Sequence, residues 1–245
     1  KPLIGCDLWL ENTQNRDQAS RIMLLCQTVD GYLKLCALVS RAYLENQHRG
    51  RPEIKREWLV ESGTEGLILL SGAMLGDVGQ ALLQGNSVAA QQLAEAWAAL
   101  FPNRFYIELQ RAGHAQQEVY ISRALSLAAA LELPVVATHP IQFIEAEDFK
   151  AHEARVCIAE GYVLADHRRP KNFTEAQYFK TQDEMVALFA DIPEALVNSV
   201  EIAKRCNLAL SLGKNFLPQF PTPNGESLDD YLVIKAKEGL AQRLE

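Results

Sequence analysis

Side chains that could ligate a metal ion stand at several strand-like runs of this sequence. Asp7 lies in "LIGCDLWL", Glu108 lies in "RFYIELQ", and His139 directly follows the apolar run "PVVAT". His114 comes shortly after the second run. Carboxylates and imidazoles are the ligands that Zn²⁺ and Mn²⁺ accept in hydrolytic enzymes. Because the carboxyl ends of parallel strands collect ligand-binding residues, the pattern raises the question whether His139 belongs to a working metal site.

The elements that would position these residues alternate between strands and helices. Apolar runs bounded by turn residues predict strands over 3–10, 19–27, 66–72, 104–110 and 134–138. Apolar residues at helical spacing predict helices over 31–46, 88–102, 118–133, 183–192, 193–207 and 227–245. Repeated strand–helix units of this length indicate a parallel sheet or a (β/α) barrel, so the predicted fold class is α/β.

The composition restricts the classes of function. The 245 residues are 48% hydrophobic, enough for a large buried core, and carry a formal net charge of −7. This acidic balance disfavours a main nucleic-acid surface, because phosphate binding uses clustered Lys and Arg. No apolar run of about 18 residues is present, so no membrane association is expected. The five cysteines form no CxxC pair, which is typical of a protein of the reducing cytoplasm.

A specific family resemblance covers nearly the whole chain. The runs that carry it are "KPLIGCD", "GLILLSGAMLGDVGQALLQGN", "FYIELQRAG", "LPVVATHPIQFIEAEDFKAHEARVCIAEG", "FADIPEALVNSVEIAKRCN" and "FLPQFPTPNGESLDDYLVIKAKEGL". The sequence resembles the PHP (polymerase and histidinol phosphatase) domain of the C-family replicative DNA polymerases, the bacterial DNA polymerase III alpha subunits. The resemblance implies a PHP-type distorted (β/α) barrel lacking its first strand–helix units, since the family's first motif, with its leading histidines, would lie upstream of Lys1.

The resemblance also assigns seven positions of this chain to the family's metal site: Asp7, Ala73, Glu108, Ala112, His139, Pro140 and Gln142. Metal-binding relatives usually carry Glu at position 7, Cys at position 73, His at position 112, and Asn-Asp-x-His over 139–142. Here Ala73, Ala112 and Pro140 offer no side-chain ligand, and Gln142 is a weak one. Disturbing even an outer partner of a metal typically costs about 10–100-fold in affinity. The resemblance therefore implies a vestigial site without metal, cofactor or catalytic residue.

Three parts are expected along the chain. Residues 1–207 form the N-terminally incomplete PHP domain, 208–226 form a linker, and 227–245 begin the polymerase module with a truncated helix. The linker is indicated by "NFLPQFPTPNGESLDD", in which prolines and a glycine replace any apolar periodicity. Ser227 is the expected N-cap of the last helix, because acidic residues follow it in the first turn.

The function implied by the resemblance is a part in chromosome replication. The parent protein would be a DNA-directed DNA polymerase, with Mg²⁺ at catalytic aspartates well beyond Glu245 and with DNA bound mainly outside this fragment. The fragment itself would support the polymerase module and bind the proofreading exonuclease subunit, together with other replicase subunits. The alternative is an active metal-dependent phosphoesterase or 3′–5′ exonuclease built from Asp7, Glu108, His114, His139 and upstream residues.

Overall fold

The structure is a computed structural model that describes residues 1–215, 217 and 220–244. Contacts within the chain divide it into two units, Lys1–Ala209 and Leu210–Glu245, and each unit is described by itself. No helix among the described residues is long and apolar enough to cross a membrane. The assignment of the second unit to a polymerase module stays a prediction.

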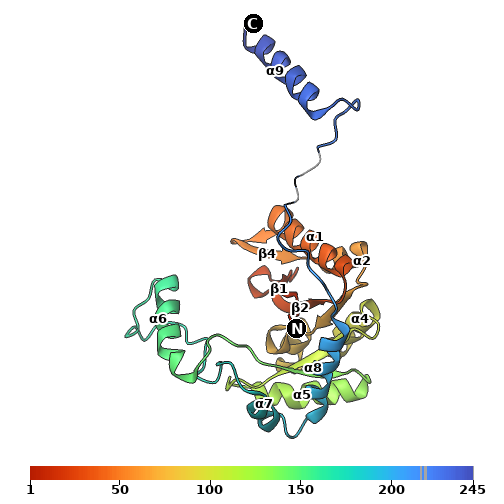
Figure 1. Cartoon of the computed structure of the whole chain (residues 1–245). Helices are drawn as coiled ribbons and strands as arrows, with labels where there is room; N and C mark the ends of the chain where they lie inside the picture. Colours follow the sequence, from red (N-terminus) through yellow and green to blue (C-terminus); the bar gives the residue numbers. More distant parts are fainter. Residues whose placement is uncertain (216, 218–219, 245) are drawn as a thin grey trace. The chain divides into compact units, whose positions relative to one another are not determined.

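The first unit is built on an open sheet of seven strands. Three of them, β1, β2 and β4, are labelled in Figure 1. In the order β3-β4-β1-β2-β5-β6-β7, the strands are Gln47–His48, Arg51–Ile54, Gly5–Leu10, Ser20–Cys26, Leu67–Leu70, Phe105–Gln110 and Val135–Thr138. The pairs β1–β4, β5–β6 and β6–β7 are parallel, whereas β1–β2, β2–β5 and β3–β4 are antiparallel. The α/β class and the PHP-type architecture are confirmed, and the sheet does not close into a complete barrel.

The antiparallel pairs make the sheet a mixed one, whereas the sequence predicted a parallel sheet or a (β/α) barrel. The connection from β1 to β2 holds only the short 3-10 turn η1 (Arg16–Gln18), and a parallel pair needs a longer crossover. Since β2 is antiparallel to both neighbours, β1 and β5 run in the same direction. The strands β1, β4, β5, β6 and β7 therefore all end at one edge of the sheet.

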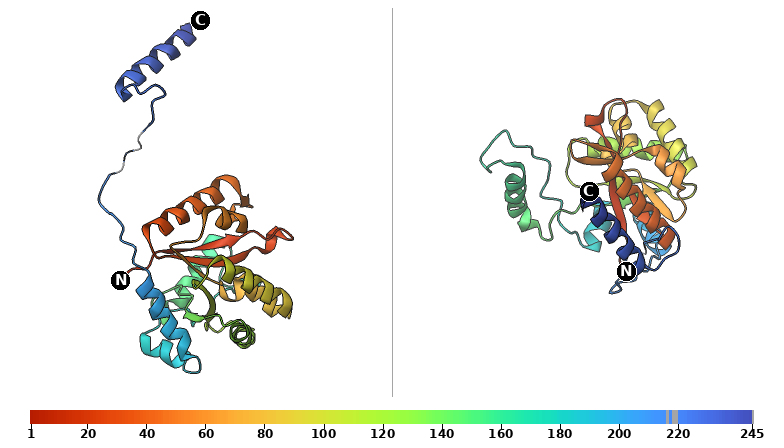
Figure 2. Two further views of the ribbon diagram at one scale, coloured as in Figure 1. Left: turned by 90° about the vertical axis from the view of Figure 1, so that its right-hand side faces the viewer. Right: turned by 90° about the horizontal axis from the view of Figure 1, so that it is seen from above.

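Helices cover both faces of the sheet, as the two views of Figure 2 show. In the first unit the helices α1 to α8 are Val29–Glu45, Arg56–Ser62, Asp77–Leu83, Ser87–Leu100, Gln117–Ala130, Phe149–Glu160, Gln182–Leu188 and Pro193–Arg205. The larger core packs α1 to α5 against side chains such as Leu24 and Ile107. The smaller core joins Ile68 and Val136 to Ile202 of α8. Alternate residues of the central strands are thus buried on opposite faces.

Residues between β7 and α7 form an excursion around α6 that projects from the rest of the unit in Figures 1 and 2. The 3-10 turn η3 (Ala146–Asp148) leads into α6. A parallel bridge between Phe143 and Tyr178 closes the excursion at its base. Its interior is aromatic: the His152 ring lies 4.6 Å from that of Phe173 and 5.4 Å from that of Phe143.

The second unit contains α9 (Leu228–Leu244). Ser227 accepts a hydrogen bond from the Asp230 N–H at 3.1 Å, so this residue is the N-cap that the sequence predicts. Tyr231 of the first turn stacks on Phe220 with 5.6 Å between ring centroids.

Candidate functional site

The pairing register places a group of polar side chains on one face of the sheet, near the edge where the parallel strands end. Asp7, Met23, Leu70 and Tyr106 are paired in a row across four strands, so their side chains share a face. Side chains two residues further along β2 and β6 lie on the same face. Gln110, which lies two residues beyond Glu108 on the same face, is paired with Thr138 of β7. We call the polar members the strand-end cluster: Asp7, Arg21, Glu108, Gln110 and Thr138.

Glu108 is the buried centre of the strand-end cluster, with no exposed surface. Its Oε1 accepts hydrogen bonds from the Thr138 hydroxyl and, at 3.0 Å, from the Gln110 amide. Its Oε2 is buried without a partner among the described residues. Burial raises the pKa of Glu108, although the Thr138 hydrogen bond and the charge of Arg21 oppose that rise. One carboxylate oxygen is thus satisfied by the protein and the other is not.

Arg21 and Asp7 supply opposite charges beside this carboxyl group. Arg21 Nε lies 3.5 Å from Asp7 Oδ1, and the side chains are 24% and 47% exposed. The Nε atom is itself buried and forms no hydrogen bond to the part of the chain that the structure describes. The contact is therefore an ion pair across β1 and β2, on the side of the sheet where Glu108 lies.

The turn after β5 brings Ala73 to this edge. Gly72 adopts a φ of +78°, and a Cβ there would lie 1.9 Å from the Arg21 carbonyl oxygen, so the turn packs directly on β2. Ala73 follows in the short turn η2 (Ala73–Leu75) and is 2% exposed. The Ser71 hydroxyl accepts the Glu108 N–H at 2.9 Å. The position that the resemblance assigns to a ligand cysteine is therefore held in place by backbone contacts, but carries only a methyl group.

The loop after β6 is closed by hydrogen bonds of its own. The N–H groups of Ala112 and Gly113 both donate to Gln117 Oε1, at 2.8 and 3.0 Å. The Thr174 hydroxyl donates to the Ala112 carbonyl. His114 lies half-buried in the same loop, just before α5. The polar groups of the loop thus bond to one another and to the excursion.

After β7, the excursion also engages His139. Its Nε2 lies 2.8 Å from the Ala176 carbonyl and so donates to it, whereas Nδ1 is buried without a partner among the described residues. Burial lowers the pKa of His139. The Pro140 carbonyl accepts from the Gln177 amide at 3.0 Å, and Gln142 is exposed. Among His139, Pro140 and Gln142, only His139 has a buried side-chain atom that could ligate a metal, its Nδ1.

The residues present do not fit the metal cluster that the PHP fold implies. Among the described residues, no three His, Cys, Asp or Glu side chains are placed to hold one ion. Asp7 and Glu108 are the carboxylates at hand, and the guanidinium of Arg21 lies beside Asp7. A bound divalent cation would meet this fixed positive charge at close range. The absence of metal nevertheless stays a prediction, because no measurement on the protein tests it.

Sequence reasoning missed three members of the strand-end cluster: Arg21, Gln110 and Thr138. Arg21 interrupts an alternating buried face of β2, next to Met23 and Leu25. A charged residue inside a strand-like run was the available signal, because the unpaired charge of such a residue requires a partner.

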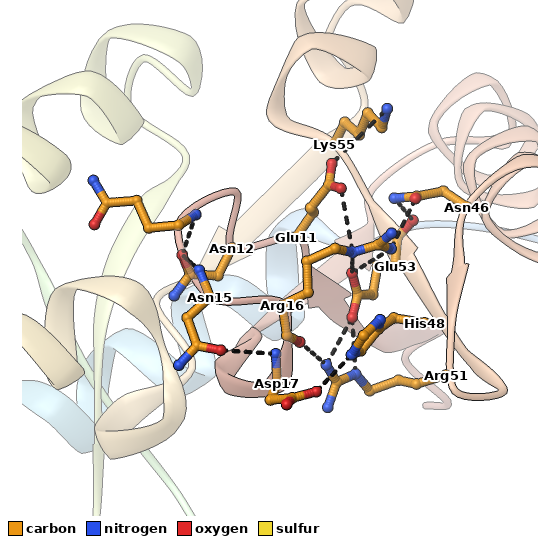
Figure 3. A network of polar contacts seen from close by, with 11 residues as sticks. Glu11, Asn12, Asn15, Arg16, Asp17, Asn46, His48, Arg51, Glu53 and Lys55 are labelled. Atoms are coloured by element: carbon orange, nitrogen blue, oxygen red, sulfur yellow. Dashed lines mark hydrogen bonds and ion pairs between the residues drawn. The ribbon is translucent and has the colours of Figure 1, made fainter.

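A second polar network lies at the opposite end of the strand order, around Glu53 of β4, and is drawn in Figure 3. Glu53 has no exposed surface. Arg16 donates to its Oε2 at 2.9 and 3.2 Å, and Arg51 donates to its Oε1 at 2.7 and 3.0 Å. Asn46 accepts from Arg16 at 2.9 Å and donates to the Glu53 carbonyl at 3.1 Å. The network ties η1 to the β3–β4 hairpin, and both carboxylate oxygens of Glu53 are fully bonded.

Several known proteins are similar in sequence to this chain. Residues 1–112 match the family model of the PHP domain. All 245 residues align at 48% identity with the DNA polymerase III subunit alpha of Pseudomonas aeruginosa, and at 49% with that of Vibrio cholerae. The subunit of Escherichia coli K12 is 47% identical over 244 residues. The predicted resemblance is confirmed. The chain spans about a fifth of the length of these relatives, 21% in each case.

Proposed function

We propose that this chain is the PHP segment of a replicative DNA polymerase alpha subunit, and that it is a non-catalytic, metal-free support and docking domain. The observation that carries the proposal is the 48% identity over the full 245 residues to a protein named DNA polymerase III subunit alpha. The parent protein would perform DNA-directed nucleotidyl transfer with Mg²⁺ in the cytoplasm. That chemistry belongs to residues outside this chain.

The strand-end cluster supports the non-catalytic part of the proposal. Hydrolysis of a phosphodiester at a PHP site requires a metal ion to polarise the phosphoryl group and to activate water. In this chain Ala73, Ala112 and Pro140 supply no ligand, and the Glu108 Oε1 is already bonded to Thr138 and Gln110. Burial of Glu108 also raises its pKa and so disfavours the charged form that a metal ion needs.

The partner in this proposal is the proofreading exonuclease subunit, bound alongside other replicase subunits. A polymerase whose PHP domain lacks a nuclease needs a separate protein to remove mispaired ends. The experiment is a pull-down with the protein carrying these 245 residues and the purified exonuclease. Retention of the exonuclease is the expected result, with an unrelated acidic protein as the control. Loss of retention would remove the docking role and leave the polymerase relationship standing.

A second candidate function is a residual metal-dependent phosphoesterase or 3′–5′ exonuclease. The observation in its favour is that Glu108 Oε2 and His139 Nδ1 are both buried without a partner among the described residues. This function predicts Mn²⁺- or Zn²⁺-dependent hydrolysis of an aryl phosphate or a phosphodiester, abolished by His139→Ala. The metal-free proposal predicts no metal-dependent hydrolysis above background, with or without the substitution.

A further inference from the structure

Most of the unsatisfied polar atoms lie at one place in the fold. Four buried side-chain atoms have no hydrogen-bond partner in the described part of the chain, and three of them are Arg21 Nε, Glu108 Oε2 and His139 Nδ1, whereas the fourth, His152 Nε2, lies on α6. The first three lie on β2, β6 or directly after β7, at the edge where the parallel strands end. Buried polar atoms are normally paired, so such a concentration indicates a site whose original partners have changed.

Arg21 is held at this site by its backbone as well as by its charge. Gly72, with its positive φ, lets the turn after β5 approach so closely that an added Cβ would lie 1.9 Å from the Arg21 carbonyl. The side chain points to the face that carries Asp7 and Glu108, because paired and alternate residues share a face. The guanidinium therefore contacts the Asp7 carboxylate from a fixed strand, on the face that also carries Glu108.

The three charges act on one another. Asp7 Oδ1 lies 3.5 Å from Arg21 Nε. The pKa of Glu108, raised chiefly by burial, is lowered by the charge of Arg21 and raised further by that of Asp7. A guanidinium stays charged at every accessible pH, so its positive charge is permanent. The strand-end cluster therefore combines the permanent positive charge of Arg21 with two carboxyl groups, those of Asp7 and Glu108.

We propose that Arg21 replaces the metal ion of this site, supplying a covalently attached positive charge that compensates Asp7 and Glu108 and keeps divalent cations out. This inference rests on the proposed metal-free function and adds to it the residue responsible. In this account Arg21 balances the negative charge of the strand-end cluster, so the stability of the Arg21→Gln protein should depend on a bound divalent cation.

The experiment compares thermal unfolding in 1 mM Mn²⁺ and in chelator for the parent protein, Arg21→Gln and Arg21→Lys, together with bound Mn²⁺ after equilibrium dialysis. Arg21→Gln leaves two carboxylates uncompensated, so we expect its apparent Mn²⁺ affinity to rise about tenfold or more, in the range by which a site's neighbours alter metal binding. Mn²⁺ should then raise its melting temperature, since a ligand of the folded state stabilises it. The parent and Arg21→Lys should show neither effect.

Two control variants separate the outcomes. Arg123→Gln removes an arginine that bonds a backbone carbonyl away from the cluster and should gain no Mn²⁺ response. Asp7→Asn combined with Arg21→Gln should lose the gained response. If the Arg21→Gln protein does not fold in chelator, recovery of folding in 1 mM Mn²⁺ supports the inference, and failure to recover overturns it. An Arg21→Gln protein that folds and ignores Mn²⁺ also overturns it, whereas Mn²⁺ binding by the parent itself overturns the metal-free function.

Discussion

Two fully buried glutamates in one sheet have opposite surroundings. Glu53 receives four hydrogen bonds from Arg16 and Arg51, which satisfy both of its oxygens. Glu108 has one oxygen bonded to neutral donors, one oxygen without a described partner, and its nearest charge compensation from Arg21. The first is the arrangement of a structural ion pair, whereas the second is the arrangement expected of the vestigial metal site that we propose.

The difference separates a carboxylate that stabilises the fold from one that we propose belongs to a former metal site. Leaving a buried charge uncompensated costs several kcal/mol, so a carboxylate that only supports the fold acquires complete partners. Glu108 lies at a position that the family resemblance assigns to the metal site, and burial raises its pKa. Incomplete satisfaction, rather than burial, therefore marks the site.

The largest effect should follow from breaking the complete network. Glu53→Gln removes the charge that holds Arg16 and Arg51, and we expect the free energy of unfolding to fall by about 3 kcal/mol. This lies at the low end for a broken buried pair, because the arginines are partly exposed. Chemical denaturation measures it. The surface substitution Glu61→Gln, which removes one of the two carboxylates that Arg41 contacts, is the matched control and should cost under about 1 kcal/mol. Equal losses in the two variants would contradict the comparison.

A smaller effect of opposite sign is expected at the incomplete site. Because the pKa of Glu108 is raised, the folded state binds more protons than the unfolded state, so stability falls as pH rises above the unfolded value of about 4.3. Glu108→Gln should therefore match the parent near pH 4 and equal or exceed its stability at pH 7, by up to about 1 kcal/mol. Denaturation curves at the two pH values test this. A variant much less stable than its parent at pH 7 would show that the carboxylate is as well compensated as Glu53.

The smallest effect concerns the excursion around α6. His152 lies between Phe143 and Phe173, near Arg155, with the Glu153–Arg169 pair on the same segment. Burial lowers the pKa of His152, so the folded state binds fewer protons, and stability is lost as pH falls below the unfolded value of about 6.5. Hydrogen exchange of α6 amides should accelerate severalfold between pH 7.5 and pH 5, after correction for intrinsic rates. His152→Phe should remove that pH dependence, and an unchanged dependence would exclude His152 as its source.

The sequence predicts the strand ends well and the polar partners poorly. The runs around Asp7, Glu108 and His139 identify the strands that carry them, because apolar runs bounded by turn residues are a local signal. The antiparallel β1–β2 pair and the contacts of Arg21 depend on register between distant segments. The bounds of α6 were not predicted for a related reason: the helix has no apolar stripe, and two of its three buried residues, His152 and Glu153, are polar. Such residues are recognisable only when their aromatic and charged partners are known.

Metal content tests the central claim most directly. The protein that carries these 245 residues would be soaked with Mn²⁺ and Zn²⁺, dialysed, and assayed for bound metal. We predict a stoichiometry near zero, because Arg21 compensates the carboxylates and Ala73, Ala112 and Pro140 provide no ligand. Two or three tightly held ions per molecule would contradict the account, and the phosphoesterase function would then take first place.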